Sequence, residues 1–179
     1  MTSTISVASP VGTLRIEGTE EAITYITLPG SGPEHAERPP RSNGAGRTRK
    51  AEAPAGTKAA GATRDVLGNA ADQLEEYFSG TRTRFDLPLE LDGTPFQKEV
   101  WLALAEIPYG ETVSYAELAS MVGRPNAFRA VGQANGANPI PIVLPCHRVV
   151  ASGGRIGGYG GGLDMKRRLL AIEGVTAFA

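Results

Sequence analysis

The 179-residue chain has little of several residue types, and each shortage excludes a class of protein. Its one cysteine, Cys146, excludes an intrachain disulfide and a cysteine-rich zinc site, so no metal is expected. No apolar run approaches the roughly 18 residues of a membrane span. The first residues, MTSTISVASP, have neither the basic start nor the apolar core of a signal peptide. We therefore expect a cytoplasmic protein that does not engage a membrane.

The composition that is present is typical of a globular protein with generous loops: 41% hydrophobic and 21% charged residues, with 23 glycines and 13 prolines. A formal net charge of −1 argues against a nucleic-acid partner. That average hides a difference between the halves. Residues 1–94 carry 10 basic and 13 acidic side chains, whereas residues 95–179 carry 8 and 6. A polyanion would therefore meet the C-terminal half.

Residues 31–64 contain no Val, Ile, Leu, Met, Phe, Tyr or Trp, and their net charge is +4. Such a stretch cannot bury enough apolar area to offset its ordering entropy, so we predict a flexible insertion. A basic arm that contacts DNA is the functional alternative to a tolerated long loop.

The rest of residues 1–91 is predicted to form a small α/β lobe. Three strand-like runs precede the insertion, at residues 4–8, 12–17 and 22–28. After it, apolar residues recur at helical spacing at Leu67, Ala71, Leu74 and Phe78. Residues 85–91 alternate again, although Pro88 confines this run to a sheet edge or a bulge.

The pattern becomes helical from Thr94 onward. Capping boxes at Thr94 and Ser114 predict two helix starts, and further helices are expected at residues 126–135 and 163–173. The third of these four helices should place Phe128, Val131 and Ala134 on one side. The short helices at 114–122 and 126–135 form a helix-turn-helix candidate, either as core scaffold or for binding DNA.

The segment around Cys146 carries the most chemistry. Cys146 is followed by His147 and Arg148, a proton acceptor and a positive field that could help a thiol of pKa about 8.5 become a thiolate. The alternative is a small buried hydrophobe. Neighbouring strand residues face opposite ways, so His147 would need a turn, a helical start or a bridging water to reach the thiol.

A catalytic histidine also needs a third group to fix its tautomer. Glu173, the last acid of the predicted C-terminal helix, is the candidate, and a solvated helix end is the alternative. The only other histidine, His35, lies in the predicted insertion. The glycine-rich tract 153–162 lacks the Gly-Lys-Ser/Thr ending of a phosphate loop, so no nucleotide cofactor is expected.

The stretch from residue 94 to 173 resembles the methylated-DNA–protein-cysteine methyltransferases, also called O6-alkylguanine-DNA alkyltransferases. The matching pieces, in chain order, are Phe96-Gln97, Val100-Trp101, Ile107-Pro108-Tyr109-Gly110, Ser114-Tyr115-Ala116-Glu117, Arg129-Ala130-Val131-Gly132, Asn138-Pro139, Pro145-Cys146-His147-Arg148-Val149, Gly158-Tyr159, Lys166 and Glu173. The N-terminal half matches in layout alone.

The resemblance implies a fold and an activity. The fold would be a small ribonuclease-H-like sheet with a helix in residues 1–91, followed at 92–179 by a mainly helical, winged-helix-like lobe with a helix-turn-helix. The activity would be irreversible transfer of an alkyl group from O6-alkylguanine in duplex DNA to Cys146, with O4-alkylthymine as a further candidate substrate. The protein would act once, as a monomer and without a cofactor.

The resemblance also implies residue roles. Cys146 would accept the alkyl group, His147 would deprotonate it through a water, and Glu173 would polarise His147. Tyr115 would donate a hydrogen bond near the purine and supply a proton to the leaving guanine. On the DNA side, Arg129 would fill the stack that the flipped base leaves. The remaining expected roles are a hinge at Asn138, a DNA contact at Arg148, and a base pocket bordered by Val149, Tyr159, Gly160 and Lys166.

Gly160 stands where some relatives carry serine, which would loosen the pocket. Three other activities remain open from the sequence: a Cys–His hydrolase, a helix-turn-helix regulator, and a protein that binds alkyl lesions without repairing them.

Overall fold

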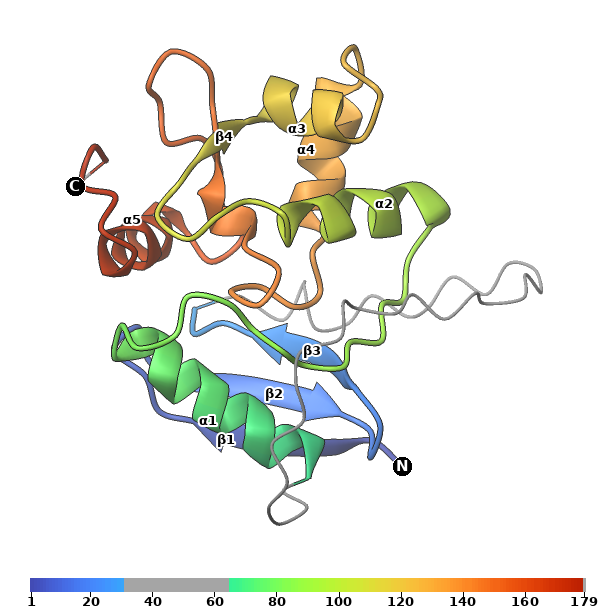
Figure 1. Cartoon of the computed structure of the whole chain (residues 1–179), viewed down its shortest axis with the longest axis vertical. Helices are drawn as coiled ribbons and strands as arrows, with labels where there is room; N and C mark the ends of the chain where they lie inside the picture. The colour runs from blue at the N-terminus through green and yellow to red at the C-terminus, as the bar shows by residue number, and fades with distance from the viewer. Residues whose placement is uncertain (31–64, 179) are drawn as a thin grey trace.

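The chain folds into a sheet lobe, made of β1–β3 and α1, and a helical lobe, made of α2–α5 (Figure 1). The structure is a computed structural model and describes residues 1–30 and 65–178. The insertion predicted at 31–64 lies outside the described residues. Among the described residues, no helix has the length and apolar character needed to cross a bilayer.

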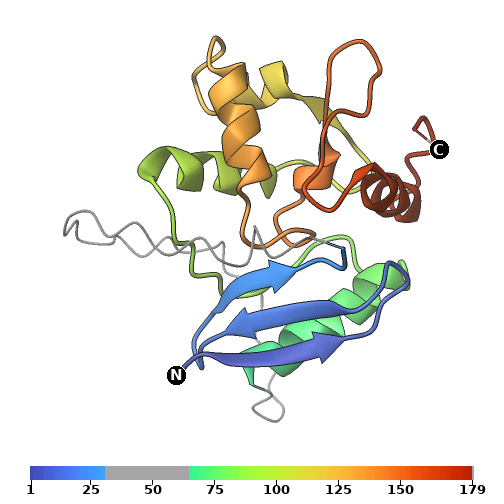
Figure 2. The same cartoon turned by 180° about the vertical axis from the view of Figure 1, so that it is seen from behind.

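The sheet lobe is an antiparallel meander of β1 (Ser3–Val7), β2 (Leu14–Gly18) and β3 (Ile23–Thr27), in that spatial order. Helix α1 (Val66–Phe78) covers one face of this sheet (Figure 2). The predicted alternation in β2 is confirmed, because Leu14 and Ile16 are fully buried between exposed or half-buried neighbours. Helix α1 turns its buried side chains, Leu67, Ala70, Leu74 and Tyr77 among them, toward the same core.

The run at residues 85–91 lies at the sheet edge, as Pro88 predicted, but forms no regular strand. This segment makes a single bridge, between Leu89 and Ile23 of β3. The amide of Ile23 donates to the carbonyl of Pro88, and the amide of Glu90 donates to the carbonyl of Ile23. Pro88 has no amide hydrogen to extend the ladder, so the pairing ends after one residue at the sheet edge.

The helical lobe contains α2 (Pro95–Leu104), α3 (Tyr115–Met121), α4 (Phe128–Gly136) and α5 (Leu163–Ile172). Both predicted capping boxes are present, at the starts of α2 and α3. A short parallel pair joins β4 (Val113–Ser114) to β5 (Val149–Val150). Helices α3 and α4 pack together across a turn in which Gly123 has a φ of 69°, which favours glycine.

Phe128 was expected on one side of this helix with Val131 and Ala134, but it does not share their burial. Its side chain is 47% exposed at the first residue of α4, whereas Val131 and Ala134 are buried. Helix α4 begins two residues later than predicted. The ring lies against Arg129, whose guanidinium carbon is 5.9 Å from the ring centroid.

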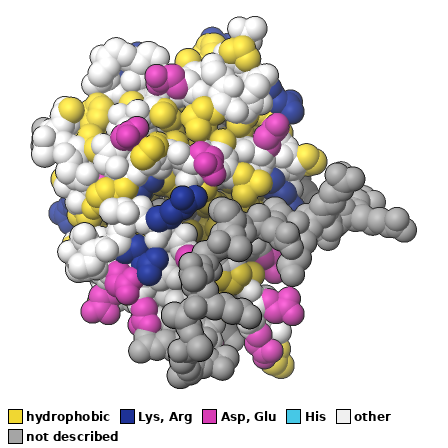
Figure 3. All heavy atoms as spheres, viewed as in Figure 1, with side chains coloured by type: hydrophobic (Ala, Val, Ile, Leu, Met, Phe, Trp, Pro, Cys, Tyr) yellow, Lys and Arg dark blue, Asp and Glu magenta, His cyan; other side chains and the backbone are white. Residues whose placement is uncertain are grey.

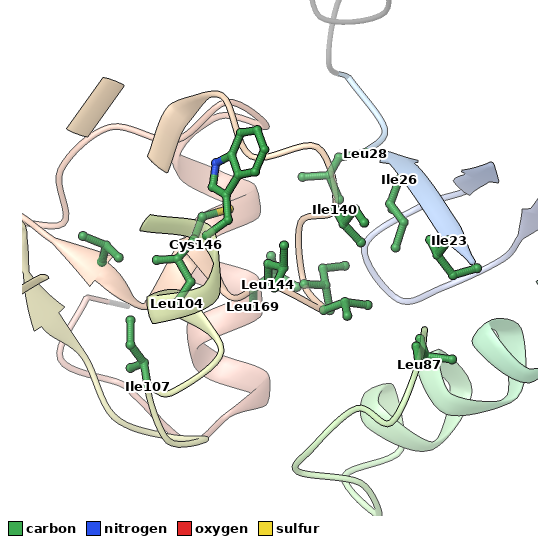
Figure 4. Packing of buried hydrophobic residues seen from close by; sticks show 14 of the residues in the cluster. Ile23, Ile26, Leu28, Leu87, Leu104, Ile107, Ile140, Leu144, Cys146 and Leu169 are labelled. Carbon is green, nitrogen blue, oxygen red and sulfur yellow. The ribbon is translucent and has the colours of Figure 1, made fainter. Parts of the chain in front are cut away.

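The two lobes share one hydrophobic core. The amide of Ile26 in β3 donates to the carbonyl of Pro139, at 2.9 Å, and so bonds the edge of the sheet to the segment after α4. Leu28 from the sheet lobe and Ile140 from the helical lobe lie side by side in this contact (Figure 4). The segment that leads to Cys146 is therefore packed directly on the sheet lobe.

Candidate active site around Cys146

Cys146 begins the short 3₁₀ helix η2 (Cys146–Arg148), immediately before β5. It is 5% exposed and lies among apolar side chains that include Leu104, Leu144 and Leu169 (Figure 4). In a 3₁₀ helix, successive side chains point about 120° apart, so Cys146 and His147 face different surroundings.

The loop before Cys146 is held by the side chain of Asn138. Its amide Nδ2 donates to the carbonyl of Leu144 at 2.7 Å, and its Oδ1 accepts from the amide of Ile140 at 3.0 Å. Between these two anchors, Ile142 has a φ of 74°, a left-handed conformation that is costly for a β-branched residue. The clamp therefore maintains a strained turn that delivers Cys146 to its buried position.

His147 is fully buried and pairs with Glu173, at the C-terminal end of α5. Its Nε2 lies 2.7 Å from Oε1 of Glu173. Because an ionised carboxylate only accepts, Nε2 must carry the hydrogen, which leaves Nδ1 as the acceptor nitrogen of a neutral ring. Within the part of the chain that the structure describes, Nδ1 has no hydrogen-bond partner.

Burial lowers the pKa of His147. The neighbouring Glu173 carboxylate raises it, but burial is the larger effect, so the net change is downward. A neutral imidazole with an open Nδ1 can therefore receive a proton at neutral pH. No histidine is seen among the side chains coloured on the face drawn in Figure 3.

Glu173 is the centre of the polar network, because its carboxylate accepts five hydrogen bonds. Oε1 accepts from His147 Nε2, Tyr77 Oη and Arg148 Nη2. Oε2 accepts from Arg148 Nε and the Gly110 amide. Burial disfavours the charged form, but the His147 and Arg148 donors outweigh it and lower the pKa of Glu173 to about 2. Glu173 is therefore ionised at all physiological pH values. Of the two alternatives, the solvated helix end is excluded by this burial.

The expected DNA contact of Arg148 is wrong. Its guanidinium is buried, with Nε 2.8 Å from Glu173 and Nη1 donating to the carbonyl of Ile107 at 2.5 Å. The charge is needed inside the protein because an ionised, buried carboxylate requires a paired cation. Arg148 thus binds Glu173 rather than a phosphate.

The Cys146 thiol has a raised pKa because burial disfavours the thiolate. The polar groups of Asn138 and Tyr159 and the charge of Lys166 oppose that effect and lower it. The phenol of Tyr159 has a raised pKa, first from its own burial and then from its proximity to Cys146. At neutral pH the thiol keeps its proton, so alkyl acceptance requires a base.

Lys166 lies on α5 and is fully buried. Its Nζ donates to the carbonyl of Val149 at 2.6 Å and to that of Gly158 at 3.1 Å. Burial lowers its pKa to about 8. The lysine thereby fastens the glycine-rich loop to β5. A Cβ added at Gly160 would meet no heavy atom within 4 Å, so this position leaves open space.

The remaining expected residues lie on the helix-turn-helix. Tyr115 begins α3, and its pKa is raised first by burial and then by the charge of Cys146. Arg129 lies on α4 and is exposed. Among the expected residues, Asn138, Tyr159 and Lys166 thus act on Cys146, Glu173 pairs with His147, and Arg129 lies at the surface. Within residues 1–30 and 65–178, no group of His, Cys, Asp and Glu is placed to hold a metal.

The sequence also matches known families and structures. Residues 4–91 match the ribonuclease-like domain of 6-O-methylguanine DNA methyltransferase, and residues 95–175 match the DNA-binding domain of the same family. A methylated-DNA–protein-cysteine methyltransferase of Mycolicibacterium paratuberculosis is 45% identical over 168 residues, which is 94% of this chain and 90% of that protein. The chain belongs to this methyltransferase family.

Two further relatives agree. The protein of the same name from Methanosarcina acetivorans is 42% identical over 166 residues, covering 93% of this chain and 94% of that protein. The crystal structure of Mycobacterium tuberculosis OGT in complex with DNA has a TM-score of 0.73 and 40% sequence identity, covering 98% of this chain and 93% of that one. The expected fold of a ribonuclease-like lobe followed by a DNA-binding lobe is confirmed.

Two groups that bind Glu173 were not predicted from the sequence of this family member. One is the amide of Gly110, at 3.2 Å, where φ is 78° and an added Cβ would come within 3.0 Å of the Glu173 carbonyl oxygen. The other is Tyr77, on the ribonuclease-like domain. A signal for Tyr77 existed, because it follows Ala70 and Leu74 on the buried face of α1, and a buried tyrosine hydroxyl needs a partner.

Proposed function

We propose that this methyltransferase repairs DNA by moving an alkyl group from O6 of guanine in duplex DNA to Sγ of Cys146, acting as a monomer and without a cofactor. The observation that carries the proposal is the buried thiol next in sequence to His147, whose Nε2 is fixed on Glu173 and whose Nδ1 is left to accept. One copy of the chain supplies every residue that the proposal uses.

The proton leaves the thiol toward His147. Since the 3₁₀ geometry turns the two side chains apart, Nδ1 would accept the proton through a bridging water, and the imidazolium would be stabilised by Glu173. Sulfur then attacks the alkyl carbon, so that an S–C bond forms as the C–O6 bond breaks. The departing guanine takes up a proton, for which Tyr115, at the start of α3, is the proposed donor.

The target base has to leave the DNA base stack before it can reach this thiol. A sulfur that is 5% exposed cannot contact O6 inside a base stack, so the nucleotide must be flipped out at a cost of a few kcal/mol. Arg129 is exposed on the second helix of the helix-turn-helix, and its planar guanidinium suits it to stack in the vacated space. Val149, Tyr159 and Gly160 would border the pocket for the extruded base.

The reaction would run once per protein molecule. The product is a thioether, which water does not cleave, and the chain has no second cysteine to remove the alkyl group. Lys166 would keep the pocket loop in place during this single event, through its bonds to Val149 and Gly158.

Intact-protein mass spectrometry after incubation with a duplex containing O6-methylguanine tests the proposal. We expect each protein molecule to gain the mass of one methylene and no more, and peptide mapping should locate the gain at Cys146. Unmethylated duplex, or the Cys146→Ser variant, should give no gain. Absence of the gain would refute alkyl transfer. Repeated turnover would instead indicate a Cys–His hydrolase, and full biological activity of Cys146→Ser would indicate a DNA-binding regulator.

A further inference from the structure

Tyr77 connects the ribonuclease-like domain to the alkyl-acceptor site. It lies near the end of α1, is fully buried, and donates its hydroxyl hydrogen to Oε1 of Glu173 at 2.7 Å. The two residues are 96 positions apart, so only the packing of the two lobes brings them together. Every other donor to that carboxylate comes from the helical lobe.

The ring of Tyr77 and its hydroxyl have separable roles. The ring packs against Phe78, Phe85 and Tyr109, with centroid separations of 5.2, 5.5 and 6.1 Å. A phenylalanine would keep these contacts. The hydroxyl adds one thing, a hydrogen bond to a buried carboxylate, and charge-assisted bonds of this kind are among the stronger ones.

That hydrogen bond acts on the same oxygen that holds His147. Oε1 accepts from His147 Nε2, from Arg148 Nη2 and from the Tyr77 hydroxyl, so its negative charge is divided among three donors. Each added donor weakens the pull of the carboxylate on the others. Among the described residues, the titratable and charged groups that face the His147–Glu173 pair are Arg148 from η2, Lys166 from α5, Tyr77 from α1, Tyr109 from the segment after α2 and Tyr159 from the glycine-rich loop.

We propose that Tyr77 is a positioning residue for alkyl transfer: its hydroxyl orients the Glu173 carboxylate and limits the negative charge that Oε1 presents to His147. This inference rests on the proposed role of His147 as the base. Without the hydroxyl, Oε1 would bind the imidazolium more strongly. His147 would then hold a proton at a pH where it should be neutral and ready to accept one.

The test compares Tyr77→Phe with Tyr109→Phe in the full chain. Tyr109 is a matched control, because its hydroxyl also makes one hydrogen bond in the same region, to the carbonyl of Ile172 at 2.9 Å, but does not bond to the carboxylate. Single-turnover methyl transfer from O6-methylguanine duplex is measured from acid to alkaline pH, well below both melting temperatures. The ring signals of His147 are followed by NMR over the same range and assigned with His35→Gln, since the chain has two histidines.

For Tyr77→Phe we expect the acid midpoint of the rate profile and the His147 titration to move up together by roughly half a pH unit or more, a threefold or larger change in the protonation ratio. The rate should return to that of the parent at alkaline pH. Tyr109→Phe also removes one hydroxyl hydrogen bond, but one to a backbone carbonyl, so it should lower the melting temperature by less and leave both midpoints in place.

Unchanged midpoints in Tyr77→Phe, or equal shifts in both variants, would overturn the positioning role. A parent protein that transfers no methyl group would overturn the proposed function instead. The His147 titration can be followed without any transfer, so the two failures are distinguishable.

Discussion

Replacing Glu173 by glutamine should destabilise the protein far more at neutral pH than in acid. The Glu173 carboxylate is fully buried. Its hydrogen-bond partners among the described residues are all N–H or O–H donors. Glutamine keeps one accepting oxygen and replaces the other by an NH₂ group, which would face N–H and O–H donors. The guanidinium of Arg148 would also lose its counter-charge while remaining buried.

The magnitude follows from the pKa of Glu173, which falls from an ordinary 4.5 to about 2 in the folded protein. That difference corresponds to about 3 kcal/mol of stability. Because the folded pKa is the lower one, this stability is fully present above about pH 4.5 and is lost as the pH falls toward 2. Removing one partner of a buried ion pair costs about 3–5 kcal/mol of stability, a range that includes the value derived from the pKa of Glu173. We therefore expect Glu173→Gln to lower the free energy of unfolding by about 3–5 kcal/mol at pH 7. This difference from the parent should narrow as the pH falls from about 4.5 toward 2.

Urea unfolding of the full chain at a series of pH values measures this difference directly. Glu106→Gln, an exposed carboxylate on the same lobe, is the control and should stay within about 0.5 kcal/mol of the parent. The parent supplies a second measurement, since its own free energy of unfolding should fall between pH 4.5 and 2. A Glu173→Gln variant as stable as the parent at pH 7, or a difference that does not change with pH, would refute the reasoning.

Three further predictions concern other parts of the chain. Arg129→Ala should sharply slow methyl transfer from duplex DNA and spare reaction with the alkylated free base, and equal losses in a side-by-side rate assay would refute the stacking role. Asn138→Ala should cost about 1–3 kcal/mol, because it removes both bonds of the clamp around Ile142; denaturant unfolding beside exposed Asn126→Ala checks this, and equal stability would count against the clamp. Thr94→Ala should cost about 1 kcal/mol in the same assay, since it removes the cap of α2, and an unchanged midpoint would contradict the capping box.

Local features of the fold could be predicted from the sequence because they depend on near neighbours. A capping box places Thr94 and Gln97 three residues apart, and both bonds are present. The alternation of β2 likewise gives its buried face. The run at 85–91 forms no regular strand because alternation gives a face but not a partner, and Pro88 restricts pairing to one residue.

The candidate site was predictable in its residues and less so in its connections. Glu173 was expected beside His147, and that pair is present at 2.7 Å. The DNA contact expected of Arg148 came from the resemblance, and nothing local to its sequence indicated a buried carboxylate 25 residues away. Tyr77 required the docking of two lobes, a long-range contact that no local pattern encodes.

Trp101 gives the protein a built-in optical reporter. It is the only tryptophan of the chain, it is 2% exposed on α2, and its Nε1 donates to the carbonyl of Ala134 on α4 at 2.8 Å. The intrinsic fluorescence of the whole molecule on tryptophan excitation therefore originates from one point, where the second helix of the helix-turn-helix rests on α2. If DNA binding displaces α4, the indole hydrogen bond to Ala134 would change. Emission could then time DNA docking without an attached dye.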